Sequence, residues 1–268
     1  LVVLLFSTYS IGKILSSRFV GFMAAFFLYC YPLIFQSARQ YQLDLPLAAF
    51  VTLSIYLLLK ADRFQHTRYS IFLGLACGFA MLIKGQAAFF VAGPFLYMLY
   101  RSAPFNARQI RNLAIVVTMT ALIASIWWGS RINEALLGLK MHSVASSINF
   151  VGNSPFTWGN KYSLESIFFH TWSLFYSSLR PFLALLCISF FVPFLMRKTR
   201  YKGLYISWII PPLLLFSLVF TVKHSRFLMP ILPALALITA LGLAQVPKRR
   251  VKFSLVVISI IFSLLQYH

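Results

Sequence analysis

One acidic residue of this chain has the type and position that charge-based chemistry requires. Asp44 follows a short polar stretch and directly precedes the apolar run 45–59. An ionisable group at the edge of a membrane span is costly unless it is paired or faces water, so Asp44 is a candidate functional residue. The alternative is that Asp44 only caps a helix, with Pro46 in the first turn. Both roles are compatible.

Four basic residues fall in very short breaks on the same predicted side as Asp44. They are Arg39, Lys84, Lys223 and Arg226. Each alone is typical of a side chain that lays its stem along apolar surface and keeps its charge in water. Together they offer the planar forks and point charges that phosphate oxygens bind. Lys84 also precedes Gly85, where a helix break would turn backbone groups toward a ligand.

Other chemical motifs are weak in this sequence. His142 and His170 have no Cys, Asp or His at ligand spacing, which argues against a metal pair. The three cysteines lie inside apolar runs, so neither a disulfide framework nor a cysteine metal motif is indicated. No Walker loop or glycine-rich dinucleotide turn is present. Asp62, Glu134 and Glu165 are expected to be ordinary surface charges.

Composition excludes a soluble domain. Of the 268 residues, 60% are hydrophobic and only 10% are charged, against about 25% charged in an average soluble domain. The net charge of +20 would suggest nucleic acid in a soluble protein. Here the basic residues lie in short breaks between apolar runs, as the positive-inside rule expects. We therefore predict a lipid bilayer as partner, and no nucleic acid.

The apolar segments predict an all-α polytopic membrane protein with about ten transmembrane helices. Helix is expected because lipid offers no partner for backbone polar groups, and the segments lack the alternation of barrel strands. The segments are 1–11 (partial), 19–35, 45–59, 70–83, 87–100, 113–130, 172–196, 204–222, 227–245 and 253–267.

Residues 70–100 could form one long helix or two spans joined at Lys84. With two spans, 16 of the 24 Lys and Arg residues fall on one side; with one span the split is nearly even and Lys84 lies within the membrane. The charge bias favours two spans. The extracytoplasmic segments are then 36–44, 84–86, 131–171 and 223–226. Only the loop 131–171 is long, and long loops in compact proteins are commonly functional or disordered.

The start of the sequence suggests truncation. Leu1 lies within an apolar run, no Met precedes it, and the run 1–11 is shorter than the roughly 20 residues that a span needs. We therefore expect residues 1–268 to be one transmembrane domain that lacks its first span and first outer loop, with the loop 131–171 inside it.

Three stretches resemble the dolichyl-phosphate-mannose protein mannosyltransferase superfamily, in particular its aminoarabinose-transferase-like branch of membrane glycosyltransferases with the GT-C fold. Their order and spacing are more specific than any one of them. The stretches are Tyr31-Pro32 with Ser37-Ala-Arg39 and Leu43-Asp44; Gly74-Leu-Ala with Leu82-Ile-Lys84-Gly85; and Lys223-His-Ser-Arg226-Phe-Leu-Met-Pro230-Ile-Leu-Pro233-Ala234.

The resemblance implies an enzyme that moves a sugar from a polyprenyl-phosphate donor to an extracytoplasmic acceptor: a lipid, a glycan or a protein. It implies an integral protein of the bacterial inner membrane, with the active site on the extracytoplasmic face. Asp44 would be a second acidic residue that holds the sugar or a divalent metal ion, the one cofactor implied. Arg39, Lys84 and either Lys223 or Arg226 would hold the carrier phosphate. The catalytic base is expected upstream of Leu1.

Two other classes remain open on the residues alone. A transporter or flippase for an anionic lipid or solute would explain the cations, but it predicts polar residues near the middle of several spans, and few are seen. A membrane scaffold would leave Asp44 and the outer cations free to vary.

Overall fold

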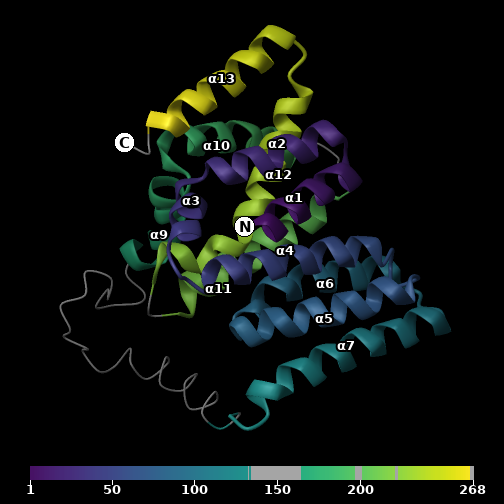
Figure 1. The fold of residues 1–268 in the computed structure, drawn as a ribbon. Helices are drawn as coiled ribbons and strands as arrows, with labels where there is room; N and C mark the ends of the chain where they lie inside the picture. The colour runs from purple at the N-terminus through teal and green to yellow at the C-terminus, as the bar shows by residue number, and fades with distance from the viewer. Residues whose placement is uncertain (132, 134–163, 197–200, 221–222, 266–268) are drawn as a thin grey trace, which may run out of the picture.

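A computed structural model gives the fold of residues 1–131, 133, 164–196, 201–220 and 223–265. Within those ranges the regular structure is helical, with no strand (Figure 1). The elements in order are α1 (Val2–Leu15), α2 (Arg18–Cys30), α3 (Pro32–Arg39), α4 (Asp44–Lys60), α5 (Thr67–Ile83), α6 (Ala87–Ser102), α7 (Ala107–Trp128), α9 (Leu164–Ser173), η1 (Leu174–Ser178), α10 (Arg180–Met196), α11 (Lys202–Leu218), η2 (Ser225–Ile231), α12 (Leu232–Gln245) and α13 (Arg249–Leu265).

The helices form two packed groups. Helices α4, α5, α6 and α7 run side by side in the lower part of Figure 1, and α4 also packs against α1. Helix α12 lies in the centre of the other group, between α2 and α10. It is built mostly from Leu and Ala, and most of its side chains are buried. A helix that is apolar on all sides is expected in such a central position.

Several helices have the length and hydropathy of membrane spans. Two segments, Ala107–Trp128 and Ser225–Gln245, are long and apolar enough to cross a membrane, and two bent pairs bring the number to as many as four in the described chain. Val2–Leu15, Thr67–Ile83 and Lys202–Leu218 are shorter apolar helices. The protein is therefore an integral membrane protein, helical throughout the regular structure of its described residues, and the count of ten spans stays a prediction.

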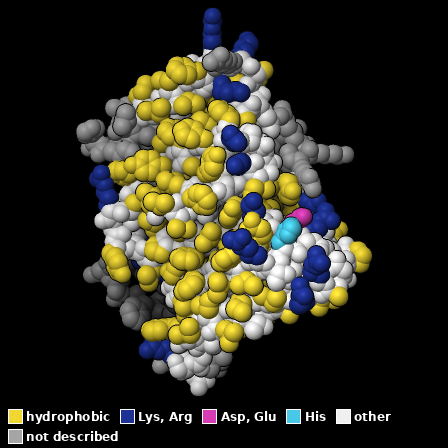
Figure 2. Space-filling model, turned by 45° about the vertical axis from the view of Figure 1, so that its right-hand side comes forward, with side chains coloured by type: hydrophobic (Ala, Val, Ile, Leu, Met, Phe, Trp, Pro, Cys, Tyr) yellow, Lys and Arg dark blue, Asp and Glu magenta, His cyan; other side chains and the backbone are white. Residues whose placement is uncertain are grey.

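One face of the molecule carries many hydrophobic side chains. Figure 2 shows one face covered broadly with hydrophobic side chains, with Lys and Arg side chains set among them and along the edge. Large exposed hydrophobic residues include Phe22, Leu96, Leu122, Ile126 and Phe253. An apolar area of this extent on a folded chain marks contact with lipid or with another apolar surface.

Two segments that the sequence predicts as single helices are bent. The first breaks between α2 and α3, which meet at 65°. Tyr31 precedes Pro32 and takes an extended conformation (φ −70°, ψ 122°), because a residue before proline is disfavoured in the helical region. The predicted apolar segment 19–35 is therefore divided into two helices at Tyr31.

The second bend divides the predicted segment 172–196. The helix Ile167–Ser178 ends in the π-helical turn η1 and meets Arg180–Phe191 at 115°. Arg180 has a positive φ of 63°, a conformation that ends a right-handed helix. The helix begins at Leu164, so it also reaches back into the region predicted as the end of the long loop.

The break at Lys84 divides two helices, as the charge bias predicts. Helix α5 ends at Ile83, Lys84 is extended (φ −154°, ψ 133°), and α6 starts at Ala87. Both α5 and α6 pack against α4, so the chain turns back on itself at 84–86. The sequence alternative of one continuous helix over 70–100 is excluded.

Gly93 allows α6 and α11 to pack closely. A Cβ atom at Gly93 would lie 1.9 Å from the backbone oxygen of Ser207 on α11. Alanine is favoured over glycine in a helix by about 1 kcal/mol, which would raise stability if the site had room. We expect Gly93→Ala instead to destabilise the fold by about 1–3 kcal/mol, since the two helices must separate.

Thermal unfolding of the detergent-solubilised protein measures this effect. Leu96→Ala, at an exposed position of the same helix, is the control and should change Tm little. A Tm for Gly93→Ala equal to or above that of the wild type would contradict the close packing of α6 on α11.

Candidate active site

Asp44 is the first residue of α4, and its side chain is directed to an ion pair rather than to a cap. Leu43 is the N-cap, and no side-chain cap hydrogen bond forms. Asp44 is only 2% exposed, and its Oδ1 accepts a hydrogen bond from Lys84 Nζ at 2.5 Å. The alternative that Asp44 serves only as a helix cap is therefore not realised.

Arg226 approaches the other oxygen of the same carboxylate. Its Nε lies 3.7 Å from Asp44 Oδ2, and its side chain is 40% exposed. The Lys84 side chain is 25% exposed. The three residues come from the start of α4, the α5–α6 turn and the start of η2. The structure thus brings three of the five predicted site residues into one group, which we call the Asp44 cluster.

Aromatic and imidazole rings line this cluster. Lys84 Nζ lies 5.8 Å from the centre of the Phe227 ring, and the His224 ring packs edge-on against Phe227 at 5.1 Å. Partial burial lowers the pKa of His224, the charge of Arg226 lowers it further, and Asp44 acts in the opposite direction. His224 borders the Asp44 cluster, and sequence reasoning missed it. The position of His224 between two predicted site residues, Lys223 and Arg226, is the sequence feature that could have indicated it.

The other two predicted cations make different contacts. Lys223 is buried, its pKa is lowered by burial, and its ammonium donates a hydrogen bond to the carbonyl oxygen of Ser217. Arg39 is exposed at the end of α3, where its guanidinium lies 4.1 Å from the centre of the Phe35 ring. Of the two candidates at 223 and 226, Arg226 is the one that forms an ion pair with Asp44.

A divalent metal fits poorly at Asp44. Such ions need several oxygen or nitrogen ligands, and the described part of the chain holds no group of three His, Cys, Asp or Glu residues suited to one. The two carboxylate oxygens also face Lys84 and Arg226, which compete with a metal for the same negative charge. The described residues therefore do not complete a metal site by themselves, and the divalent ion that the resemblance implies stays a prediction.

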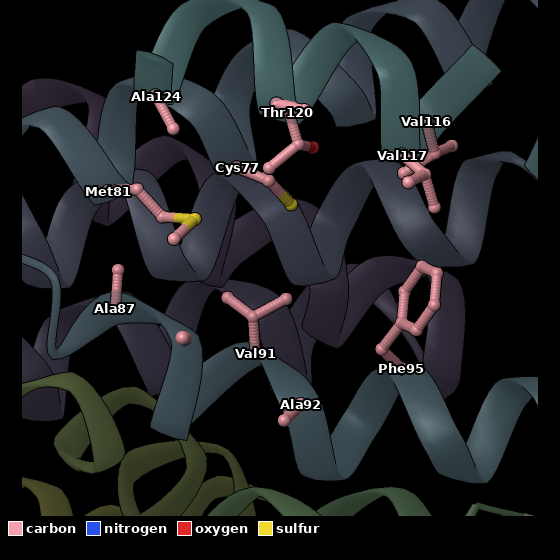
Figure 3. A pocket seen from close by; sticks show the side chains of 12 residues that line it. Cys77, Met81, Ala87, Val91, Ala92, Phe95, Val116, Val117, Thr120 and Ala124 are labelled. Carbon is pink, nitrogen blue, oxygen red and sulfur yellow. The ribbon is translucent and has the colours of Figure 1, made fainter. Parts of the chain in front are cut away.

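An apolar cavity lies beside the α5–α6 turn. It has a volume of about 380 Å³, is open on one side and is lined by α5, α6 and α7 (Figure 3). Met81 and Ala87, which flank the turn that carries Lys84, line the end of the cavity near the Asp44 cluster. The remaining lining is almost wholly aliphatic or aromatic, so hydrocarbon is the chemistry that this cavity suits.

Trp128, at the end of α7, packs against the α5–α6 turn. Its Nε1 donates to the carbonyl oxygen of Met81 at 2.9 Å, and its ring lies within 3.1 Å of where a Cβ of Gly85 would be. The end of α7 thus lies at the same end of the fold as Lys84, as the two-span topology predicts. Most of the predicted loop 131–171, with Glu134 and His142, lies outside the described residues, as does the side chain of Glu165.

The lowered pKa of His224 predicts a pH dependence of stability. The His224 imidazole binds a proton less tightly in the folded protein than in the unfolded chain, where histidines titrate at about pH 6.5. As the pH falls through that value, the unfolded chain binds a proton that the folded protein does not, so stability decreases. We expect His224→Gln to make the fall in Tm between about pH 7.5 and pH 5 shallower. His66→Gln, at an exposed position just before α5 and at the other end of that helix from Lys84, is the control. If His224→Gln leaves the dependence of Tm on pH unchanged, His224 is not the group responsible.

Comparison with known proteins agrees with the resemblance found in the sequence. Residues 1–128, which contain Asp44 and Lys84, match the family model of the dolichyl-phosphate-mannose-protein mannosyltransferases. The chain is similar in structure to ArnT from Cupriavidus metallidurans, solved bound to undecaprenyl phosphate, with a TM-score of 0.64 and 17% identity over 91% of this chain. The chain spans 44% of that ArnT chain. No curated protein sequence matches it.

Proposed function

We propose that this chain, a member of the dolichyl-phosphate-mannose-protein mannosyltransferase superfamily, works in the transfer of a sugar from a polyprenyl-phosphate donor to an extracytoplasmic acceptor. The observation that carries the proposal is the buried Asp44 carboxylate held between Lys84 and Arg226. The resemblance favours the bacterial inner membrane as the protein's location. We place the Asp44 cluster at the extracytoplasmic face, because the cluster lies at the less basic end of the predicted topology.

The cluster suits the departure of a phosphate. As the bond between sugar and phosphate breaks, negative charge grows on the phosphate oxygens. Cations that are already held in place at a water-poor boundary stabilise that charge without reorganising. Lys84 and Arg226 are the two cations in position, and both are partly exposed toward a ligand.

Asp44 has a positioning role in this proposal. Its buried carboxylate fixes the ammonium of Lys84 and the guanidinium of Arg226 relative to each other. Because the carboxylate carries only one negative charge, the cluster keeps a net positive charge for an incoming phosphate. The apolar cavity beside the α5–α6 turn gives the lipid part of such a donor a surface of matching chemistry.

A transporter or flippase for an anionic lipid is the second candidate. The observation in its favour is the pair of bent helix segments at Tyr31 and Arg180, since broken helices are common at the binding sites of transporters. The same cations would then bind the headgroup without breaking a bond.

One experiment separates the two functions. The complete protein is reconstituted in proteoliposomes with undecaprenyl phosphate carrying mannose, glucose or an amino-pentose, together with an extract of cell-envelope acceptors. The lipids are then analysed by mass spectrometry. The glycosyltransferase proposal expects undecaprenyl phosphate to be released as the sugar moves to an acceptor. Movement of an intact sugar lipid between leaflets, without release, would instead establish the transporter.

A further inference from the structure

A second group of buried polar side chains lies next to the Asp44 cluster. His170 and Ser173 on α9 and Ser217 near the end of α11 are each at most 5% exposed. Neither ring nitrogen of His170, and neither serine hydroxyl, has a hydrogen-bond partner among the residues that the structure describes. Buried polar groups that lack partners are costly and uncommon in native proteins, so three of them in neighbouring elements indicate a bound molecule.

Independent contacts bring His170 and Ser217 together. The His170 ring packs edge-on against Phe216, the neighbour of Ser217, at 6.2 Å. Lys223 donates to the carbonyl oxygen of Ser217 and interacts electrostatically with His170. Ser173 follows His170 by three residues and so shares its face of α9, which packs against α11.

This group continues into the Asp44 cluster through two phenylalanines. The Phe216 and Phe227 rings lie 6.1 Å apart, and Phe227 is the ring that Lys84 approaches. His224 also interacts electrostatically with both His170 and Asp44. Phe216 is fully buried and Phe227 is partly exposed, so a molecule whose charged part binds Lys84 and Arg226 would meet Phe227 on the side that faces the His170 group.

The chemistry of the two groups differs. Lys84 and Arg226 present positive charge, which suits phosphate. A neutral imidazole donates from one nitrogen and accepts at the other, and a serine hydroxyl does both, which suits the hydroxyl groups of a sugar. We propose that His170 and Ser217 hydrogen-bond the hydroxyl groups of the donor sugar while its phosphate lies at the Asp44 cluster. This inference rests on the proposed function and assigns the part of the site that recognises the sugar.

A binding ratio tests the inference. The affinity of the complete protein for undecaprenyl phosphate is compared with its affinity for the same lipid carrying mannose, glucose or an amino-pentose. His170→Phe keeps a ring against Phe216 and removes both nitrogens. We expect the wild type to bind one sugar-bearing lipid more tightly than bare undecaprenyl phosphate. In His170→Phe this ratio of affinities should fall about tenfold, which corresponds to roughly one hydrogen bond. The affinity of this variant for bare undecaprenyl phosphate should stay unchanged.

Each outcome of this test is decisive. A His170→Phe variant that keeps the preference, or one that loses affinity for both lipids equally, overturns the sugar assignment but leaves the proposed function standing. A wild type that binds neither kind of lipid overturns both. Should His170→Phe not fold, Ser217→Ala, which removes one hydroxyl, decides by the same ratio. His66→Phe, at the opposite end of α5, is the matched control and should behave as the wild type.

Discussion

Replacing Asp44 with Asn should lower the rate of sugar transfer by about 10²–10³-fold, with normal membrane insertion and expression. The amide keeps the size of the carboxylate but loses its negative charge. Lys84 and Arg226 then lose the counter-charge that fixes their positions 2.5 Å and 3.7 Å from the carboxylate oxygens. The effect should appear mainly in kcat, because the two cations act on charge that develops in the transition state.

Asp62→Asn is the matched control for this substitution. Asp62 is exposed in the turn after α4, and its φ of 41° is a conformation that asparagine adopts readily. Steady-state transfer by the two variants, each at the same level in the membrane, gives the comparison. If Asp44→Asn transfers sugar as fast as Asp62→Asn, Asp44 has no part in the reaction.

Replacing Lys84 with Ala should affect both stability and donor binding. The Asp44 carboxylate is nearly fully buried, and losing its nearer partner leaves only Arg226 to offset that charge. Breaking a buried pair costs about 3–5 kcal/mol; because Lys84 itself is partly exposed, we expect about 2 kcal/mol here. The apparent KM for the polyprenyl-phosphate donor should also rise more than that for the acceptor.

A double-mutant cycle separates the two effects of Lys84→Ala. Combining it with Asp44→Asn removes the buried charge together with its partner, so the stability loss should be smaller than the sum of the single losses. The raised KM for the donor should persist in the double variant. Strictly additive Tm changes would show that the ion pair contributes nothing to the fold, and equal KM changes for donor and acceptor would remove Lys84 from the phosphate site.

Parts of this arrangement follow from local sequence. The break before Gly85 is predictable because a lysine inside a span is costly, and the charge bias then fixes the turn between α5 and α6. Asp44 at the start of a helix follows from an acidic residue ahead of an apolar run. The bend at Tyr31 has a local cause in Pro32. These features each depend on a few neighbouring residues.

The pairing of the charges depends on the tertiary fold. Arg39 and Arg226 are the same residue type in similar short breaks, yet only Arg226 forms an ion pair with Asp44. The direction of the bend between α2 and α3, and the path of the chain into η2, decide which side chain faces the carboxylate. Neither is encoded in local spacing. The role of His170 could not be predicted for the same reason, since its neighbours Phe216 and Ser217 lie on another helix.

The distance along the chain between the charges of the Asp44 cluster bears on how the protein is made. Asp44 leaves the ribosome 40 residues before Lys84, and Arg226 follows only after α11. While α4 enters the bilayer, its leading carboxylate has neither cation beside it. We therefore expect α4 to insert poorly until the α5–α6 turn follows, so that α4, α5 and α6 enter the membrane together. Arg226 then joins the pair that Asp44 and Lys84 already form, so the third charge of the cluster is added late in synthesis.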